Sequence, residues 1–325
     1  MSLSRAETRG AASTPRGRAI RWIVAYRNYP SRSKLAWESK AVLLATVPFA
    51  GADVVLQTHW WAAQAAPVAV STVGLSLLLG LVALKLRAAT RGGGFAGATI
   101  TASLMFSTVM APYRPWQTAL IPVLAVSLLT WLATRMGREE KERLGTAERR
   151  RGRTASQVAA NLGVAAIASN ALAQSWLVGV PWLARATAAP MPLFAVGLAA
   201  LAEAAADTVS SEVGQVIGGR PRMITTLRPV EPGTDGAISL AGTLAGVAAG
   251  AIVALAGTLA LRGDLATFWI ACAGGVFGLF FDSLLGATLE RRAWLNNDAV
   301  NFLSTASAAA FALGLLAALA LHGAR

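Results

Sequence analysis

The sequence has little of three things that soluble enzymes normally use: charge, cysteine and histidine. Only 14% of its 325 residues are charged, against about 25% in an ordinary soluble domain. Hydrophobic residues make up 55% of the chain, and the mean hydropathy is +0.53. One cysteine, Cys272, and two histidines, His59 and His322, leave no internal disulfide and no zinc site of the usual kind. These shortages exclude a soluble enzyme and the common transition-metal enzymes, and they leave Mg²⁺ on oxygen ligands as the metal to consider.

An apolar leader is also missing from the first forty residues, which excludes a secretory signal. Residues 1–40 carry nine lysines and arginines and only two acids, Glu7 and Glu38. We expect a basic cytoplasmic tail that lies against anionic lipid. A plastid-type transit peptide, which is also rich in arginine and serine and poor in acids, is the alternative.

Apolar segments recur along the rest of the chain, so residues 41–325 are predicted to form a single all-α transmembrane domain in the lipid bilayer. A helix needs about 20 apolar residues to cross a bilayer. The sequence predicts nine spans, at residues 41–58, 67–86, 95–112, 117–134, 157–178, 191–206, 236–261, 266–287 and 299–321.

Loop charge sets the expected orientation. If the N-terminus is cytoplasmic and the nine spans alternate, all but four of the 29 basic residues fall inside; the exceptions are Arg114, Arg185, Arg262 and Arg325. This is the positive-inside pattern, and it places the C-terminus outside. The net charge of +13 is therefore mostly a topology signal. No soluble basic domain is visible, so we expect no nucleic acid partner.

Small residues four apart indicate close helix packing in lipid. Gly242, Gly246 and Gly250 show this spacing in the seventh span, and Gly274 and Gly278 in the eighth. The charged segment 138–153 is predicted to be a solvated helix or loop without a role in a site.

Ionisable residues in or beside a span are functional hypotheses by default, and the first group of them ends the predicted sixth span. Glu203 and Asp207 lie four residues apart, so on a helix their carboxylates share a face. Glu212 follows in the same segment. Paired carboxylates near hydroxyls suit Mg²⁺ bound to phosphate. The alternative is a pair of interfacial acids held by loop arginines.

A second group lies in the loop that follows and suits phosphate binding. Arginines and threonine hydroxyls match phosphate oxygens, and a glycine-rich turn at a helix start exposes backbone N–H groups to anions. Two other readings stay open: the arginines only mark the inside face, and Asp235 is an ordinary N-cap for the seventh span. The residues are Arg220, Arg222, Thr225, Thr226, Gly233, Thr234, Asp235 and Gly236.

Two further polar groups also fall on the predicted inside. Asp282 lies on an apolar helix with only Ser283 and Thr288 near it, so we expect a metal or an arginine from another loop to meet it. Asp298 lies in the loop that follows Asp282, and it is either part of this group or an N-cap for the ninth span. Gln157 and Asn161, at the start of the fifth span, are either site residues or polar contacts between helices.

At these residues the chain resembles the DUF92 family of polytopic membrane proteins, which includes the plant phytyl-phosphate kinase and an animal transmembrane protein of unclear role. The resemblance covers about residues 90–315. Its Asp-Thr and Asp-Ser elements are also similar to those of CTP-using dolichol and phytol kinases. The resembling stretches are Gly152-Arg153, Gln157-Val158, Asn161, Ala206-Asp207-Thr208, Ser211-Glu212, Gly214, Ile224-Thr225-Thr226, Gly233-Thr234-Asp235-Gly236, Asp282-Ser283, Gly286-Ala287-Thr288, Asn297 and Val300-Asn301.

The resemblance implies phosphorylation of an isoprenoid monophosphate to the diphosphate by CTP or another nucleoside triphosphate. We therefore predict that Asp207, Glu212 and Asp282 hold Mg²⁺, while the loop arginines and threonines, the Gly233–Gly236 turn, Gln157, Asn161, Ser283 and Asn301 bind phosphate or substrate. Glu290 departs from the family pattern, which leads us to expect glutamine there.

A second function class uses the same residues. A carrier or flippase for a lipid phosphate or other anion would use them for binding and gating. The composition, rich in alanine and arginine, favours a bacterial inner membrane, with the plastid envelope as the alternative.

Overall fold

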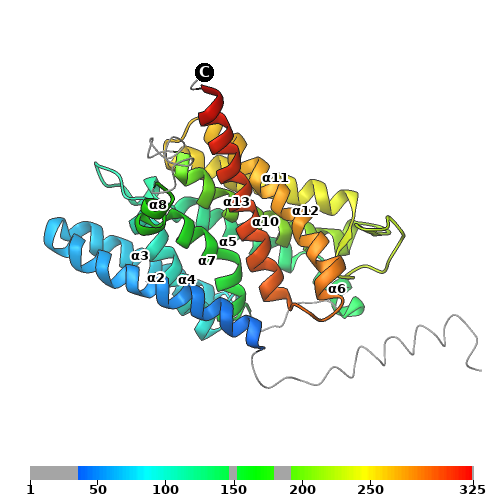
Figure 1. Ribbon diagram of the computed structural model, residues 1–325. Helices are drawn as coiled ribbons and strands as arrows, with labels where there is room; N and C mark the ends of the chain where they lie inside the picture. Colours follow the sequence, from blue (N-terminus) through cyan, green and yellow to red (C-terminus); the bar gives the residue numbers. More distant parts are fainter. Residues whose placement is uncertain (1–35, 146–151, 179–191, 324–325) are drawn as a thin grey trace, which may run out of the picture. The chain divides into compact units, whose positions relative to one another are not determined.

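Helices make up most of the computed structural model, which describes residues 36–145, 152–178 and 192–323. The predicted all-α membrane fold is confirmed. From Trp37 onward the chain forms one compact unit (Figure 1). Its helices are α2 Trp37–Gln64, α3 Ala66–Lys85, α4 Arg91–Ser107, α5 Leu120–Arg135, α6 Arg138–Leu144, α7 Ala155–Ser169, α8 Ala171–Val178, α10 Pro192–Ile217, α11 Leu240–Ala260, α12 Leu265–Leu285 and α13 Asn297–Gly323, with a 3₁₀ turn η1 Pro115–Gln117 and a π-helical turn η2 Gly286–Glu290.

Each predicted apolar segment coincides with a helix, and the fifth is divided at Asn170 between α7 and α8. Six of the described helices are long and apolar enough to cross a membrane: α2, α3, α10, α11, α12 extended by η2, and α13. Helices α4, α5 and α7 have 17, 16 and 15 residues, fewer than the roughly 20 that a crossing needs. The membrane bundle is therefore established, while nine full crossings are not confirmed.

Helix α10 is the centre of the bundle and corrects the predicted sixth span. That span ends at residue 206 in the prediction, but α10 continues to Ile217 through the polar segment. Its apolar window is 78% buried, because α5, α7, α11, α12 and α13 all pack against it. Hydropathy falls after residue 206 because polar side chains appear there. These side chains face neighbouring helices and a cavity, so their polarity does not terminate the helix.

Glycines bring α11 and α12 against α10, as their spacing predicts. A Cβ at Gly242 or Gly246 would lie 2.6 Å from the carbonyl oxygen of Ser210 or Ala206, respectively. A Cβ at Gly278 would collide with Cγ of Glu203. The missing side chains therefore let backbones touch, and at Gly278 they make room for a buried carboxylate.

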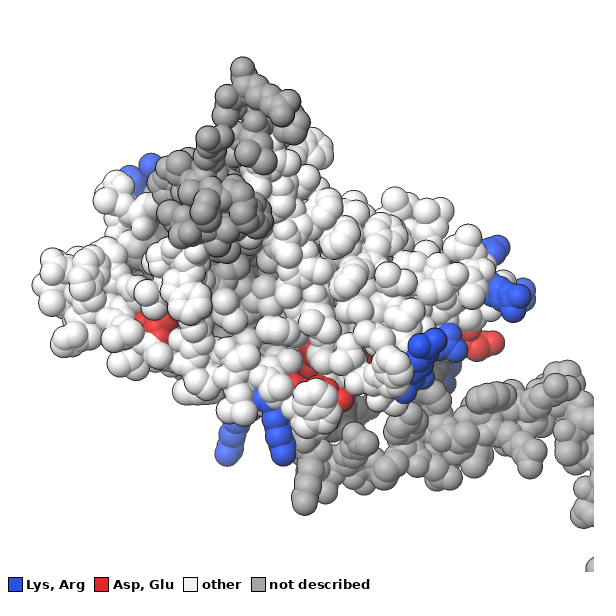
Figure 2. Space-filling model, in the orientation of Figure 1, with Lys and Arg blue, Asp and Glu red and all other residues white. Residues whose placement is uncertain are grey.

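The predicted inside segments lie together at one end of the bundle. Their hydrogen bonds join segments far apart in sequence: Thr90 N to Arg153 O (2.9 Å), Arg135 Nη2 to Leu86 O (3.0 Å), and Asn296 Nδ2 to Ser39 Oγ (2.9 Å). Figure 2 shows a wide uncharged zone on one face, with most of the visible lysines and arginines at its borders. This distribution is typical of a surface that contacts lipid.

Candidate functional site

A polar cavity of about 230 Å³ lies where α10 and α12 meet the loop before α11. It brings together seven of the predicted site residues, from three separate stretches of sequence. Its lining includes Asp207, Ser210, Ser211, Gly214, Gln215, Pro221, Pro232, Gly233, Thr234, Asp235, Gly236, Ala237, Ser239, Leu279, Asp282, Ser283, Gly286, Glu290 and Asn297.

Two carboxylates on facing helices form the inner part of this cavity. Asp207 comes from the middle of α10 and Asp282 from the last turn of α12, and their carboxyl groups are close enough to interact directly. Oδ1 of Asp282 is buried without a hydrogen-bond partner. An unpartnered carboxylate oxygen of this kind is expensive and fits a cation at this position.

Glu203 lies one turn further into the bundle and is only 1% exposed. Its Oε1 is buried without a hydrogen-bond partner, and the charge of Asp207 acts on it. It does not line the cavity. The predicted pairing of Glu203 and Asp207 on one helix face is therefore present, but only Asp207 reaches the cavity.

The turn Gly233–Gly236 forms the outer wall and is fixed against η2. Gly233 and Gly236 have φ of 81° and 75°, which glycine adopts readily and other residues do not. A Cβ on Gly236 would collide with backbone atoms of Ala287. The π-helical turn ends with Glu290, which also lines the cavity; such turns are frequent at functional sites.

Asp235 and Asp298 are not N-caps. Ser239 caps α11 by accepting from the backbone of Gly242 at 3.1 Å, and Asn296 accepts from the backbone of Ala299 at 3.0 Å. Burial raises the pKa of Asp235, and the nearby charge of Arg291 opposes this rise. Asp298 instead accepts a hydrogen bond from Ser39 at 2.5 Å.

The loop arginines and threonines predicted to bind phosphate do not line the cavity. Arg220, Arg222, Thr225 and Thr226 are exposed, and Arg222 donates to the carbonyl of Leu227 at 2.8 Å. Arg222 belongs to a short antiparallel ribbon, β1 Arg222–Met223 with β2 Ala237–Ile238, in which it pairs with Ile238. Arg220 precedes β1, and Thr225 and Thr226 follow it. Arg220 and Arg222 flank Pro221, which does line the cavity.

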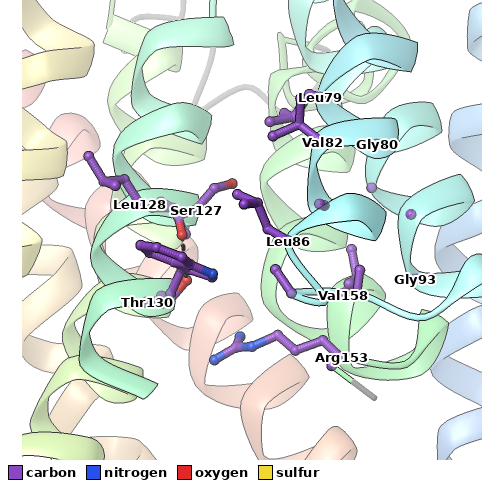
Figure 3. A pocket seen from close by; sticks show the side chains of 18 of the residues that line it. Leu79, Gly80, Val82, Leu86, Gly93, Ser127, Leu128, Thr130, Arg153 and Val158 are labelled. Carbon is purple, nitrogen blue, oxygen red and sulfur yellow. Dashed lines mark hydrogen bonds between the residues drawn. The ribbon is translucent and has the colours of Figure 1, made fainter. Parts of the chain in front are cut away.

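Arg153, which the sequence did not mark as a site residue, approaches the carboxylates. Its Nη2 lies 3.3 Å from Oγ1 of Thr208, the neighbour of Asp207, and its charge acts on Asp207. Arg153 also lines a second, mostly apolar cavity between α3, α4 and α5 (Figure 3). The sequence places Arg153 just before the predicted fifth span, and this position was the available signal of a role in the site. A loop arginine alone does not show which helix its side chain contacts.

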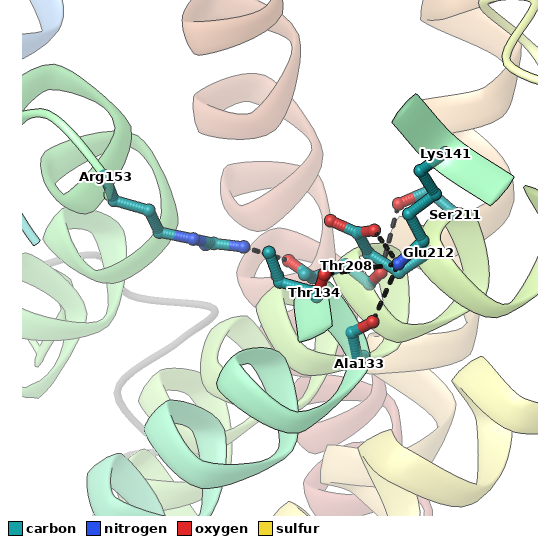
Figure 4. A network of polar contacts seen from close by, with 7 residues as sticks. All are labelled: Ala133, Thr134, Lys141, Arg153, Thr208, Ser211 and Glu212. Carbon is teal, nitrogen blue, oxygen red and sulfur yellow. Dashed lines mark hydrogen bonds and ion pairs between the residues drawn. The ribbon is translucent and has the colours of Figure 1, made fainter. Parts of the chain in front are cut away.

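Glu212 forms an ion pair with Lys141 of α6 at 2.5 Å (Figure 4). Lys141 is 1% exposed and also donates to the carbonyl of Ala133 at 2.8 Å. The expectation that 138–153 is wholly solvated is therefore wrong at Lys141. Glu212 does not line the cavity, and within the described residues no three His, Cys, Asp or Glu side chains form a metal site on their own.

The remaining predicted residues differ in their surroundings. The side chain of Gln157 accepts from the backbone of Thr154 at 2.8 Å and completes a capping box for α7. Asn161 donates to the carbonyl of Gln157 and lines the second cavity. Asn301 lines neither cavity, and its carbonyl accepts from Thr305. Ser283 lines the polar cavity.

Comparisons with known proteins match most of the chain. The family model described as "Integral membrane protein DUF92" matches residues 74–309. An uncharacterized membrane protein of Synechocystis is 31% identical over 265 residues, which are 80% of this chain and 95% of the relative. An uncharacterized membrane protein of Methanocaldococcus jannaschii is 46% identical over 108 residues, 33% of this chain and 45% of the relative.

A plant protein is similar over a long but incomplete region. The chloroplastic protein VTE6 of Arabidopsis thaliana is 28% identical over 216 residues, which cover 65% of this chain and 62% of the relative. The match therefore spans less than two thirds of the plant protein, and less than half of the archaeal one. No solved structure matches the chain.

Proposed function

Because this chain belongs to the DUF92 family of integral membrane proteins, we propose that it is a membrane phosphotransferase. It transfers the γ-phosphoryl group of CTP or another nucleoside triphosphate to an isoprenoid monophosphate. The observation that carries the proposal is the polar cavity, in which Asp207 and Asp282 meet beside the Gly233–Gly236 turn. The resemblance to a family that includes a phytyl-phosphate kinase supports the substrate class.

The chemistry needs positioning and charge neutralisation more than it needs a reactive side chain. An oxygen of the lipid phosphate forms a bond to the γ-phosphorus, and the bond from that phosphorus to the β–γ bridging oxygen breaks. The nucleoside diphosphate leaves with the electron pair. Phosphoryl transfer of this kind suits a cavity of carboxylates, hydroxyls and backbone N–H groups that lacks cysteine and histidine.

Asp207 and Asp282 are the residues that would hold Mg²⁺, since this ion commonly binds one or two carboxylates together with substrate phosphates. The unpartnered Oδ1 of Asp282 supports this assignment. When bound, Mg²⁺ would neutralise charge on the phosphate oxygens. Glu212 was predicted as a third ligand; its ion pair with Lys141 favours a role in holding α10 instead.

The size of the cavity limits what it contains. At about 230 Å³ it is smaller than the roughly 300–1,000 Å³ of a typical small-molecule pocket. It suits phosphate groups and a cation, so the nucleoside and the hydrocarbon chain must extend elsewhere. Arg220 and Arg222, exposed on either side of Pro221, are the residues we assign to the nucleotide phosphates outside it.

The mutational test is Asp282→Asn. We expect it to lower turnover by about 10²–10³, the range for losing one electrostatic contact in such a site, with the protein still folded in detergent. The matched control is Asp264→Asn at the other end of α12, where asparagine also caps helices well and turnover should be unchanged. Near-normal turnover in Asp282→Asn would remove this carboxylate from the site.

A carrier for a lipid phosphate is the second candidate, and one observation favours it. Glu203 and Asp207 lie in the middle of α10, and carrier sites are typically found near the bilayer midplane. A carrier has no reason to bind a nucleoside triphosphate. Magnesium with CTP, and magnesium with ATP, should therefore raise the melting temperature of a kinase, by a stabilisation of about 2.7 kcal/mol at a hundredfold excess over Kd. A shift with a prenyl phosphate but with neither nucleotide would replace the kinase by the carrier.

A further inference from the structure

The second cavity is larger than the polar one and has a different chemistry. It encloses about 700 Å³ between the α3–α4 pair and α5, above the start of α7. Figure 3 shows Leu79, Val82 and Leu86 on one wall and Leu128 on the other, with Arg153 across one end. Its size falls within the range of cavities that hold small-molecule ligands, about 300–1,000 Å³.

Glycines keep this cavity open on the α3–α4 side. A Cβ on Gly80 would lie 2.7 Å from the carbonyl oxygen of Gly94, so the two helices touch through their backbones. Gly97 also lines the cavity, and a Cβ added there would meet only Val158, at 3.7 Å. Helix α5 contacts α4 little and packs mainly on α10 and α11. The space between α4 and α5 is therefore not filled by side chains of either helix.

The cavity opens toward the lipid-facing surface. Its rim residues Leu86, Leu124 and Leu128 are 43%, 39% and 56% exposed. In a membrane protein such side chains lie against hydrocarbon. An apolar chain can thus enter from the bilayer without passing through water.

One end of the cavity is basic. Arg135 stacks over Trp131 at 4.3 Å, and Arg138 pairs with Glu142 at 3.1 Å; both arginines line the cavity, together with Arg87 and Arg153. The guanidinium of Arg153 reaches α10 at Thr208, beside Asp207 (Figure 4). The end of the apolar cavity and the carboxylates of the polar cavity therefore approach the same guanidinium.

We propose that the apolar cavity between α3, α4 and α5 binds the hydrocarbon chain of the lipid phosphate, and that Arg153 binds its phosphate group and directs it toward Asp207. The occupant is a single-chain lipid monophosphate, because guanidinium groups at the basic end match phosphate oxygens in shape and charge and the walls away from that end are mostly apolar. The inference rests on the proposed function for the fate of that phosphate, but not for its binding.

The chain-binding part is tested with Gly97→Leu in the full-length protein in detergent, by native mass spectrometry without nucleotide. The probes are geranyl, farnesyl and geranylgeranyl monophosphate. The added side chain occupies the cavity, so affinity should fall at least about tenfold for the longest probe and less for the shortest. Gly74→Leu on α3 is the matched control, because a Cβ there meets nothing within 4 Å, and it should leave all three affinities unchanged. Equal affinities in Gly97→Leu and wild type would overturn the proposal.

The phosphate-binding part is tested with Arg153→Gln, comparing farnesyl monophosphate with farnesol. The hydrogen bonds from Arg153 to a charged phosphate contribute to the binding free energy, so we expect the variant to bind farnesyl monophosphate at least about tenfold more weakly. The binding of farnesol should be unchanged. Arg292→Gln, in an exposed loop, is the control that removes a charge elsewhere. An equal loss for phosphate and alcohol would mean that Arg153 only maintains the fold, and would overturn its role.

Two outcomes separate this inference from the proposed function. If both variants behave as expected but no nucleotide binds, the lipid site stands and the kinase fails. If nucleotide binds and is turned over while Gly97→Leu and Arg153→Gln leave lipid affinity unchanged, the kinase stands and this site fails. Phosphatidylglycerol serves as a competitor: if it binds as tightly and responds to the same variants, the cavity takes ordinary bilayer lipid and the inference is wrong.

Discussion

Single acidic residues around the site differ in what surrounds them, and their behaviour should differ accordingly. Asp235 is partly buried, which raises its pKa, while Asp264 is exposed and its pKa is lowered because the backbone N–H and the hydroxyl of Thr267 donate to it. A raised pKa means that ionised Asp235 opposes folding at neutral pH. A lowered pKa means that ionised Asp264 favours it.

These opposite signs give a pH prediction. Asp235→Asn should melt higher than wild type at pH 7, because it removes a charge that burial disfavours. The gain should shrink as the pH falls through the pKa of folded Asp235 toward about 4, the ordinary value for aspartate. Asp264→Asn should melt slightly lower than wild type at pH 7, and that loss should disappear only in stronger acid. Melting curves in detergent from pH 7 downward measure both, and a lower melting temperature for Asp235→Asn at every pH would contradict the first expectation.

At the scale of secondary-structure elements, α6 is held to α10 by one buried ion pair. Lys141 and Glu212 are 1% and 14% exposed, and removal of one partner of a buried pair costs about 3–5 kcal/mol because the other charge stays uncompensated. Lys141→Met should therefore lower the melting temperature clearly. The double variant with Glu212→Met should recover most of the loss, since an apolar pair leaves no buried charge.

A separate single variant, Glu212→Gln, tests the role of Glu212 in the site. If Glu212→Gln abolishes turnover while the melting temperature stays the same, Glu212 belongs with Asp207 and Asp282 in the metal site, as the sequence predicts. Parallel losses of stability and activity would fit the ion pair.

The contact between the glycine turn and η2 gives another prediction at this scale. Gly236→Ala places a methyl group against the backbone of Ala287 at a φ of 75°. We expect lower stability and a large loss of turnover, because the wall of the polar cavity must move. The control is Gly219→Ala, with a similar φ of 65° but nothing within 4 Å of the added Cβ. It should show only the cost of the left-handed backbone, about 1–2 kcal/mol, and if the two variants lose equal turnover, the collision is unimportant.

At the scale of the whole molecule, the two ends of the bundle carry different loops. The basic segments near Leu86, Arg135, Arg153 and Asn296 gather at one end. Tyr113, in a connection that the prediction places outside, meets the hydroxyl group of Thr72 of α3 at 3.0 Å. We propose that the basic end faces the cytoplasm of a bacterium whose inner membrane contains the protein, with the plastid envelope as the alternative.

Cysteine labelling tests this orientation after Cys272→Ala removes the native thiol. Gly219→Cys, in the loop before β1, should resist a membrane-impermeant reagent in intact cells. Trp116→Cys in η1, where the side chain is 58% exposed, should react. The reversed pattern would place the polar cavity on the outer side, where no cytoplasmic nucleotide reaches it.

The sequence by itself determined the class of molecule and the end of the bundle at which the polar residues gather. Hydropathy is a sum over a local window, and loop charge follows from position along the chain, so neither needs tertiary contacts. Glycines spaced four apart also predict close packing locally, and Gly242, Gly246 and Gly250 do pack against α10. The acids at positions 207 and 282 were recognisable for the same reason, since a charge in an apolar helix is visible without a partner.

Only the tertiary structure decided which polar residues share a cavity. Asp207 and Asp282 meet because α10 and α12 pack with those faces together, whereas Glu212, little more than one turn beyond Asp207, faces α6 and Lys141. The cavity beside Arg153 exists because α5 packs on α10 and α11 and leaves space beside α4. These outcomes depend on the rotation and spacing of helices that are distant in sequence. The sequence of each helix determines its apolar and polar faces. Which neighbouring helix packs against each face is decided only when all the helices pack around α10.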